Sequence, residues 1–188
     1  MSRITKMMAG RKNEASRGTP PQSVSRRTKA SEPESSFSHL SPDGRARMVN
    51  VGAKAVTVRA AKAEAWVEVG PKIAAQLKKR GALAKGNVIE TARIAGIMAA
   101  KQTPGLIPMC HPLVLEVVEV AVSISGSAVH VTSHVTCEGK TGVEMEAMTA
   151  AAVAALTVYD MCKSAEKGIT IGSVRLLEKT GGKSGRWK

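Results

Sequence analysis

The chain has very few aromatic side chains: among its 188 residues there are two Trp, one Tyr and one Phe. Proteins that hold single-stranded nucleic acid do so largely by stacking successive bases on several aromatic rings. So few rings argue against such a surface. A basic nucleic-acid-binding module therefore stays only as an alternative, motivated by an isoelectric point near 10.1.

Paired cysteines and long apolar runs are also missing. The three cysteines, Cys110, Cys137 and Cys162, are odd in number and show no CxxC spacing, so we expect free thiols in a reducing compartment. Lys, Glu or Thr interrupts each long apolar stretch before it reaches the roughly 18 residues of a membrane span. The sequence therefore predicts a cytoplasmic protein that does not enter a membrane.

Acidic residues are scarce: 15 Asp or Glu face 28 Lys or Arg, which gives a formal net charge of +13. Residues 1–47 hold ten basic and four acidic side chains, nine serines and four of the eight prolines. Such a segment buries too little apolar surface to offset the entropy of ordering it. We interpret residues 1–37 as a basic, disordered extension and residues 38–188 as one folded domain. Because Arg-rich and Ser-rich starts are also typical of transit peptides, an organelle is the alternative compartment.

Hydrophobic periodicity predicts a domain that mixes helices and strands. Residues 61–69 alternate between small apolar and larger or charged side chains, which favours a strand although alanine favours helix. Pro71 can open a short helix that Gly81 ends. A second helix is expected from Asn87 to just before Pro104.

Further along, the patterns predict a hairpin of residues 113–124 and 128–136, a helix from Thr141 to about Lys167, and a strand of residues 169–178. Alternation on both sides of a Ser-Gly-Ser turn is typical of a hairpin. The spacing of Thr141 and Glu144 is that of a capping box. This order of elements predicts an α+β fold, with helices on one face of an antiparallel sheet.

Asp160 and Lys163 are the first candidate catalytic residues. They stand three apart on the long predicted helix, where side chains at this spacing are neighbours. An aspartate can orient the ammonium, and partial burial brings a lysine pKa toward neutrality, so that it can transfer protons. The apolar neighbours Met161 and Cys162 favour a buried functional pair, with an ordinary surface ion pair as the alternative.

Glu144 and Glu146 lie in the first turn of the same helix, where acidic side chains commonly compensate the helix dipole. Fourteen residues separate Glu146 from Asp160, which corresponds to about 21 Å along the helix axis. One compact site cannot use both ends of a straight helix. Either one of the two residues is structural, or two copies of the chain pack so that opposite helix ends meet.

Two prolines bracket Cys110 and His111 between a predicted helix and a predicted strand. His111 is a candidate acid, base or hydrogen-bond donor and Cys110 a candidate nucleophile; a structural histidine and a buried thiol are the alternatives. We expect no zinc site, because this adjacent pair has no second pair at metal spacing. A polyanionic ligand or, alternatively, a solvated basic surface would suit the recurring basic residues, which are Arg59, Lys85, Lys140, Lys163, Lys179 and Lys183.

Six runs of residues, taken together, closely resemble the cyclic pyranopterin monophosphate synthase family of molybdenum cofactor biosynthesis. None of the runs is specific alone, and the resemblance covers about residues 38–188. The runs are Lys85-Gly86, Thr91–Ile97, Leu106–Pro112, Lys140–Glu146, Ala154–Lys163 and Lys179–Gly185.

The resemblance implies a ferredoxin-like fold and a lyase that acts on a cyclised dihydroguanosine triphosphate. The implied products are cyclic pyranopterin monophosphate and diphosphate. It also implies a homo-oligomer, a hexamer built as a trimer of dimers, with active sites at the dimer interfaces. No redox cofactor is required for this net change, and Mg²⁺ is compatible with the triphosphate.

By resemblance, Asp160 and Lys163 are the catalytic pair. The substrate-binding residues that the resemblance implies are Arg59, Lys85, Met109, Cys110, His111, Glu144, Met145, Glu146 and Lys179. The chain departs from the family pattern at Asn50, Asn87, Glu138 and Arg186-Trp187. A catalytically silent partner of another pathway enzyme is the remaining alternative.

Overall fold

The structure is a computed structural model that describes residues 43–183 and 185–188. The extension predicted over residues 1–37 lies outside the described residues and stays a prediction. The elements follow in the order β1 (Thr57–Glu68), α1 (Gly70–Arg80), β2 (Ala82–Leu83), β3 (Gly86–Asn87), α2 (Val88–Leu106), β4 (Val117–Ser125), β5 (Ala128–Gly139), α3 (Glu144–Cys162) and β6 (Thr170–Thr180).

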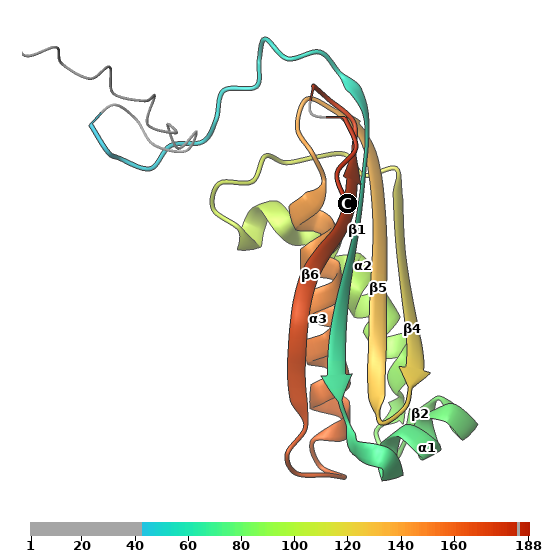
Figure 1. Cartoon of the computed structure of the whole chain (residues 1–188). Coiled ribbons are helices and arrows are strands. Elements are labelled where there is room, and N and C mark those ends of the chain that lie inside the picture. Colours follow the sequence, from blue (N-terminus) through green and yellow to red (C-terminus); the bar gives the residue numbers. More distant parts are fainter. Residues whose placement is uncertain (1–42, 184) are drawn as a thin grey trace, which may run out of the picture. The chain divides into compact units, whose positions relative to one another are not determined.

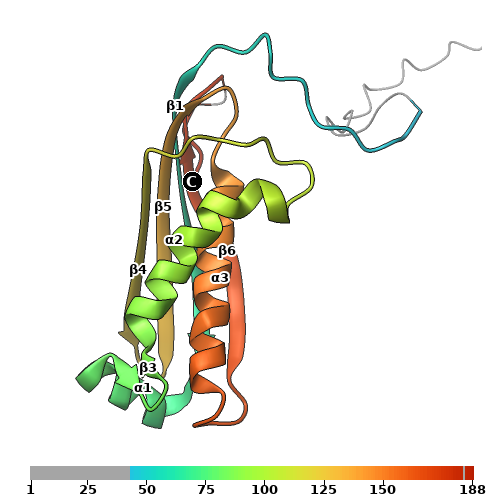
Figure 2. The same ribbon diagram turned by 180° about the vertical axis from the view of Figure 1, so that it is seen from behind.

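Four strands form one antiparallel sheet in the order β4-β5-β1-β6, and β2 and β3 form a separate small hairpin. The helices α2 and α3 lie side by side on one face of the large sheet, while α1 lies near one end of it (Figures 1 and 2). The predicted α+β fold with helices on one face is thus confirmed, and it is consistent with a ferredoxin-like fold.

Small side chains form the contact between helix and sheet. Ala61, Ala63, Ala65 and Val67 point from β1 into the core, each at most 1% exposed. They meet a helix α3 whose inward residues are mainly alanines, also fully buried. On α2, a Cβ at Gly96 would come within 2.9 Å of the Ala150 carbonyl oxygen. The two helices can therefore pack closely only because this position lacks a side chain.

Several predicted features are confirmed. The alternating alanines form β1 rather than a helix, because alternation buries one side of the strand completely. Gly81 ends α1 in the left-handed conformation, with φ of 65°. Asn87 caps α2 by accepting a hydrogen bond from the backbone N–H of Glu90 at 3.0 Å. The hairpin of β4 and β5 turns over the two residues between Ser125 and Ala128.

The predicted end of α2 before Pro104 is wrong, because the helix continues to Leu106. Proline lacks an N–H group, so the bond that position 104 would donate is absent. The turn continues because Ile107 N–H donates to the Thr103 carbonyl at 2.9 Å. The Thr103 hydroxyl also donates to the Ala99 carbonyl at 3.2 Å.

The predicted limits of the long helix are also wrong. Val143, not Thr141, precedes the first turn of α3, and no side chain caps it. The helix ends at Cys162 rather than near Lys167, because Ala165 N–H donates to the Cys162 carbonyl in a tighter turn. In the hairpin, β4 begins at Val117 rather than at residue 113. Among the described residues, no helix combines the length and hydropathy needed to cross a bilayer.

Candidate active site

Three charged side chains meet at the C-terminal end of α3. The Lys163 ammonium lies 2.7 Å from Oδ1 of Asp160. Lys85, in the turn between β2 and β3, reaches the same residue: its Nζ donates to the Asp160 carbonyl at 2.9 Å and lies 3.8 Å from Oδ2. The fold therefore adds a second cation to the pair that the sequence singled out.

The prediction that Asp160 and Lys163 form a buried pair is wrong for the single chain, since their side chains are 61% and 53% exposed. The apolar neighbours Met161 and Cys162 point into the core instead, because successive helical residues are turned by about 100°. The pKa of Lys163 is raised, not lowered, because its ammonium is hydrogen-bonded to the Asp160 carboxylate. The same bond, helped by the charges of Lys163 and Lys85, lowers the pKa of Asp160.

A second charged group lies at the N-terminal end of α3. Glu144 in its first turn accepts from Lys179 of β6, with 3.1 Å between Nζ and Oε1. Arg59 of β1 donates from Nε to the Gly139 carbonyl at 3.4 Å. Gly182 lies directly against the Arg59 guanidinium, where any side chain would overlap it. This end of the helix thus carries two cations beside an acidic first turn.

Glu146 is buried in this second group, with 3% of its surface exposed. Burial raises its pKa, and the charge of Glu144 adds to that effect. Burial and then the charge of Glu146 raise the pKa of the Cys110 thiol, which places Cys110 within electrostatic reach of this carboxyl. Because a raised pKa disfavours the thiolate, the structural reading of Cys110 is stronger than the nucleophilic one.

The segment that joins α2 to β4 passes over the end of the molecule where α3 begins (Figures 1 and 2). It carries Met109 and His111, both half-buried like Cys110. Met145, the residue directly before Glu146, remains 36% exposed. The structure therefore sorts the predicted residues into two groups that α3 separates, about 21 Å apart along its axis.

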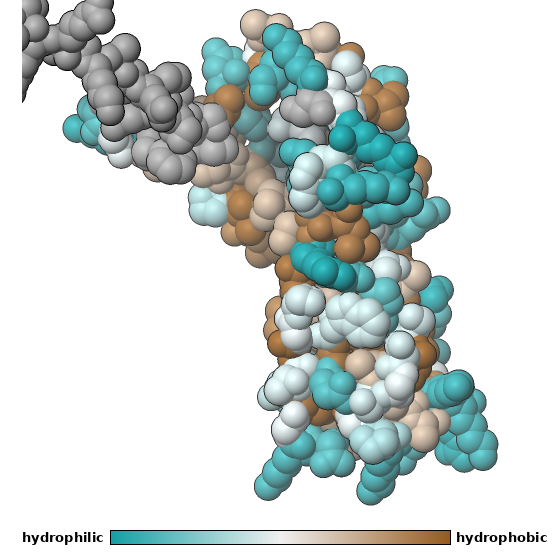
Figure 3. Space-filling model, viewed as in Figure 1, coloured by the Kyte–Doolittle hydropathy of each residue, from teal (hydrophilic) through white to brown (hydrophobic). Residues whose placement is uncertain are grey.

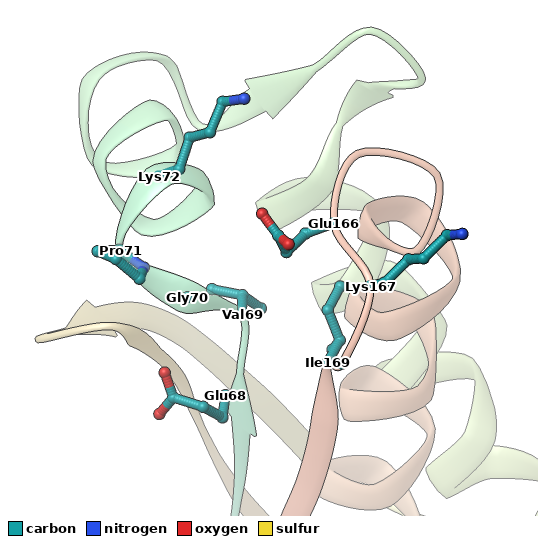
Figure 4. A pocket seen from close by; sticks show the side chains of 9 residues that line it. Glu68, Val69, Gly70, Pro71, Lys72, Glu166, Lys167 and Ile169 are labelled. Carbon is teal, nitrogen blue, oxygen red and sulfur yellow. The ribbon is translucent and has the colours of Figure 1, made fainter.

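Neither of two surface cavities contains a predicted site residue. The larger, about 300 Å³, lies between the start of α1 and the loop after α3 (Figure 4). The smaller, about 220 Å³, is lined by Ala60, Ala61, Lys62, His134, Glu178 and Thr180. Both cavities lie away from the clustered charges. The charged groups are the better candidate site, because they can carry out acid–base chemistry. In the described part of the chain, no three His, Cys, Asp or Glu side chains are arranged to hold a metal ion.

Sequence reasoning missed how some residues support the second group. Lys140, predicted only as one of several basic residues, donates from Nζ to the Gly52 carbonyl at 2.7 Å and so ties the segment before β1 to the end of β5. Gly181 and Gly182 both have positive φ, 99° and 71°. The paired glycines were the available signal for a sharp turn of the backbone.

A model of the MoaC family matches residues 48–182 of the chain. The chain belongs to the MoaC family. All the predicted site residues lie inside the matched segment, whereas residues 183–188 lie outside it. Membership implies a role in molybdenum cofactor biosynthesis, and the family consists of lyases that act on a nucleotide substrate.

Proposed function

We propose that this protein is a cyclic pyranopterin monophosphate synthase, which converts a cyclised dihydroguanosine triphosphate into cyclic pyranopterin monophosphate and diphosphate. The observation that carries the proposal is the cluster of Lys85 and Lys163 on the carboxylate and carbonyl of Asp160. It lies within the segment that the family model matches. Two ammonium groups on one carboxylate suit a reaction that moves protons and releases a polyanion.

The three charges have distinct roles in this reaction. Asp160, whose pKa is lowered, stays ionised and orients Lys163. Lys163, whose pKa is raised, begins the reaction as an ammonium and acts as a proton donor when the purine-derived ring opens. A sugar hydroxyl then attacks the α-phosphorus and gives its proton back to Lys163, while the bond from the α-phosphorus to the bridging oxygen breaks and diphosphate leaves. Lys85 and Lys163 stabilise that leaving charge.

The second group binds the rest of the substrate. Arg59 and Lys179 supply positive charge for phosphate oxygens. The buried carboxyl of Glu146 has no cation within ion-pair distance among the described residues, and it accepts hydrogen bonds from ring N–H groups. Cys110 and its neighbours Met109 and His111 line the same end, as do Glu144 and Met145. Mg²⁺, if it accompanies the triphosphate, is brought with the substrate.

A complete site requires two copies of the chain, because one α3 holds the two groups too far apart for a single small molecule. Large apolar side chains remain exposed along the helical layer, and such patches mark interfaces: Ile94, Met98, Leu106, Leu156 and Tyr159. Leu156 and Tyr159 lie on α3 between the two groups. A second copy packed antiparallel along α3 covers them. It also brings the acidic first turn of one helix to the lysines at the end of the other.

The decisive experiment incubates the purified full chain with the cyclised nucleotide and measures product mass and released diphosphate. Stoichiometric formation of the pyranopterin and diphosphate supports the proposal. Absence of both products, in a folded dimer that still binds the nucleotide, contradicts it and favours a silent pathway partner. The hexamer is tested separately by sedimentation, which distinguishes it from an isolated dimer.

A further inference from the structure

The end of the described chain returns to the sheet beside a proposed substrate-binding residue. Trp187 N–H donates to the Lys179 carbonyl at 2.9 Å, and Lys179 N–H donates to the Trp187 carbonyl at 3.0 Å. This is an isolated antiparallel bridge on the outer side of β6. Because β6 is an edge strand, these two backbone groups of Lys179 would otherwise have no strand partner.

Side-chain contacts also hold the C-terminal segment against β6, one residue before the Trp187–Lys179 bridge. Arg186 donates from Nε to Oε1 of Glu178 at 2.6 Å, and Lys188 lies 4.0 Å from the other carboxylate oxygen. The hydrogen bond from Arg186 lowers the pKa of Glu178. The Glu178 side chain is only 16% exposed, so it is a firmer anchor than most surface carboxylates. Hydrophilic side chains gather on the molecular surface at this end of the sheet (Figure 3).

We propose that Arg186 and Trp187 form a C-terminal clamp that positions Lys179 to bind a phosphate group of the substrate. The inference rests on the proposed function for the identity of the ligand. On its inner side, the Lys179 backbone pairs with Ala61 of β1; on its outer side, Trp187 is its backbone partner among the described residues. The side chain then reaches Glu144 at 3.1 Å. Arg186 is a positioning residue, because it acts through Glu178 and the backbone of β6.

The clamp restrains the backbone of Lys179, from which the long lysine side chain extends. A lysine loses much rotamer entropy when it binds an anion, and a mobile backbone would add to that cost. Fixing the backbone at Lys179 leaves only the side chain to be ordered. The clamp residues lie outside the segment that the family model matches.

The first test measures the KM of the cyclised nucleotide and the Kd of inorganic diphosphate for the full chain, for Arg186→Ala and for a chain without residues 186–188. We expect both constants to rise about fivefold in Arg186→Ala, the upper range for one exposed ion pair, and further in the deletion, with kcat nearly unchanged. Arg186→Lys should recover part of the loss. The matched control is Arg175→Ala, which removes an Nε–Oε1 contact of equal length, 2.6 Å, between Glu64 and the same strand.

The second test measures amide hydrogen exchange at Lys179. The deletion should speed exchange at this amide by at least about tenfold, whereas the amide of Val67, on the inner strand β1, should not change. If the full chain releases no product, the proposed function fails, while the Kd of diphosphate and the exchange rate still decide the clamp. Unchanged exchange at Lys179 in the deletion, or constants that rise equally in Arg175→Ala, would overturn the clamp.

Discussion

The ammonium of Lys163 lies 2.7 Å from Oδ1 of Asp160, one turn earlier on α3, and Lys85 approaches the other carboxylate oxygen at 3.8 Å. The contact raises the pKa of Lys163 and lowers that of Asp160. Lys163 and Asp160 are therefore both charged near neutral pH, and with Lys85 the cluster has two basic side chains and one acidic one, a formal excess of one positive charge. This excess attracts a triphosphate, and it makes Lys163 a proton donor rather than a base before substrate binds.

We predict that Lys163→Ala and Asp160→Asn each reduce turnover by about a hundredfold or more, the usual contribution of a positioned acid–base group. Both side chains are exposed in the single chain, so the melting temperature should change little. Product formation and thermal unfolding are measured in parallel. The matched control is Glu90→Gln, which removes an exposed i,i+3 contact on α2, to Arg93, and should leave turnover unchanged. Near-normal turnover by Lys163→Ala would exclude Lys163 as the donor.

The buried carboxyl of Glu146 predicts a pH-dependent stability. Burial raises its folded-state pKa above the unfolded value of 4.5. The contribution of this carboxyl to the free energy of unfolding is therefore fully present below pH 4.5. It is lost as the pH rises through the folded-state pKa, because the carboxyl ionises more readily in the unfolded state. Glu146→Gln removes this loss of stability at higher pH, because glutamine does not ionise. Compared with the natural chain, the variant should gain stability between pH 4 and pH 7, measured as the urea midpoint at each pH.

Glu178→Gln is the control for this pH dependence. The pKa of Glu178 is lowered by Arg186, so its stabilising contribution is present at neutral pH and lost as the pH falls. The two variants should thus shift the urea midpoint in opposite directions at pH 7. Equal shifts of one sign would show that the charge of Glu146 is compensated by a partner that the single chain does not contain.

The sequence was sufficient where a pattern decides a local structure. Alternation identified β1 against its alanine content, and Asn87 with Glu90 identified the start of α2. It was insufficient where tertiary contacts decide. The spacing of Thr141 and Glu144 matches a capping box, but Thr141 does not cap the helix, because α3 begins after Val143. The i,i+3 spacing correctly predicted the contact between Asp160 and Lys163. It could not predict how exposed their side chains are, because exposure depends on what packs against that end of the helix.

The supporting contacts of the second group were beyond sequence reasoning for the same reason. Lys179 meets Trp187 only because the chain reverses after β6, where Gly181 and Gly182 adopt positive φ. A pair of glycines indicates a turn but not the partner that the turn reaches. Likewise, Lys85 reaches Asp160 across 75 positions of sequence, a contact that no local spacing encodes.

The exposed apolar side chains of the helical layer predict where two copies meet. Leu156, 56% exposed on α3, should lie at the centre of that interface. Leu156→Glu buries a charge there, which is strongly unfavourable without a partner, so the dimer should dissociate and turnover should fall. Val117→Glu is the control, because Val117 is exposed on the sheet rather than on the helices. Sedimentation is the measurement. A dimer that survives Leu156→Glu but not Val117→Glu would place the interface on the sheet.

Mixing two inactive variants tests whether one site uses both ends of α3 from different copies. Lys163→Ala removes the group at one end of the helix, and Glu146→Ala removes the group at the other. If each site takes Lys163 from one copy and Glu146 from its partner, a mixed dimer contains one intact site and one doubly defective site. Random exchange of equal amounts makes half of the dimers mixed, so about one quarter of the natural activity should return.

This recovery depends on exchange, so the two variants are co-expressed with different affinity tags and the mixed dimer is purified through both. The purified mixed dimer should then show about half of the natural activity. The control pair is Lys163→Ala with Asp160→Asn, because these residues lie 2.7 Å apart on the same helix end. Both belong to the same half-site, so every site of that mixed dimer lacks one of them and remains inactive. No recovery in the test pair would mean that each copy builds its site alone, whereas recovery in the control pair would mean that Asp160 and Lys163 of one copy serve different sites.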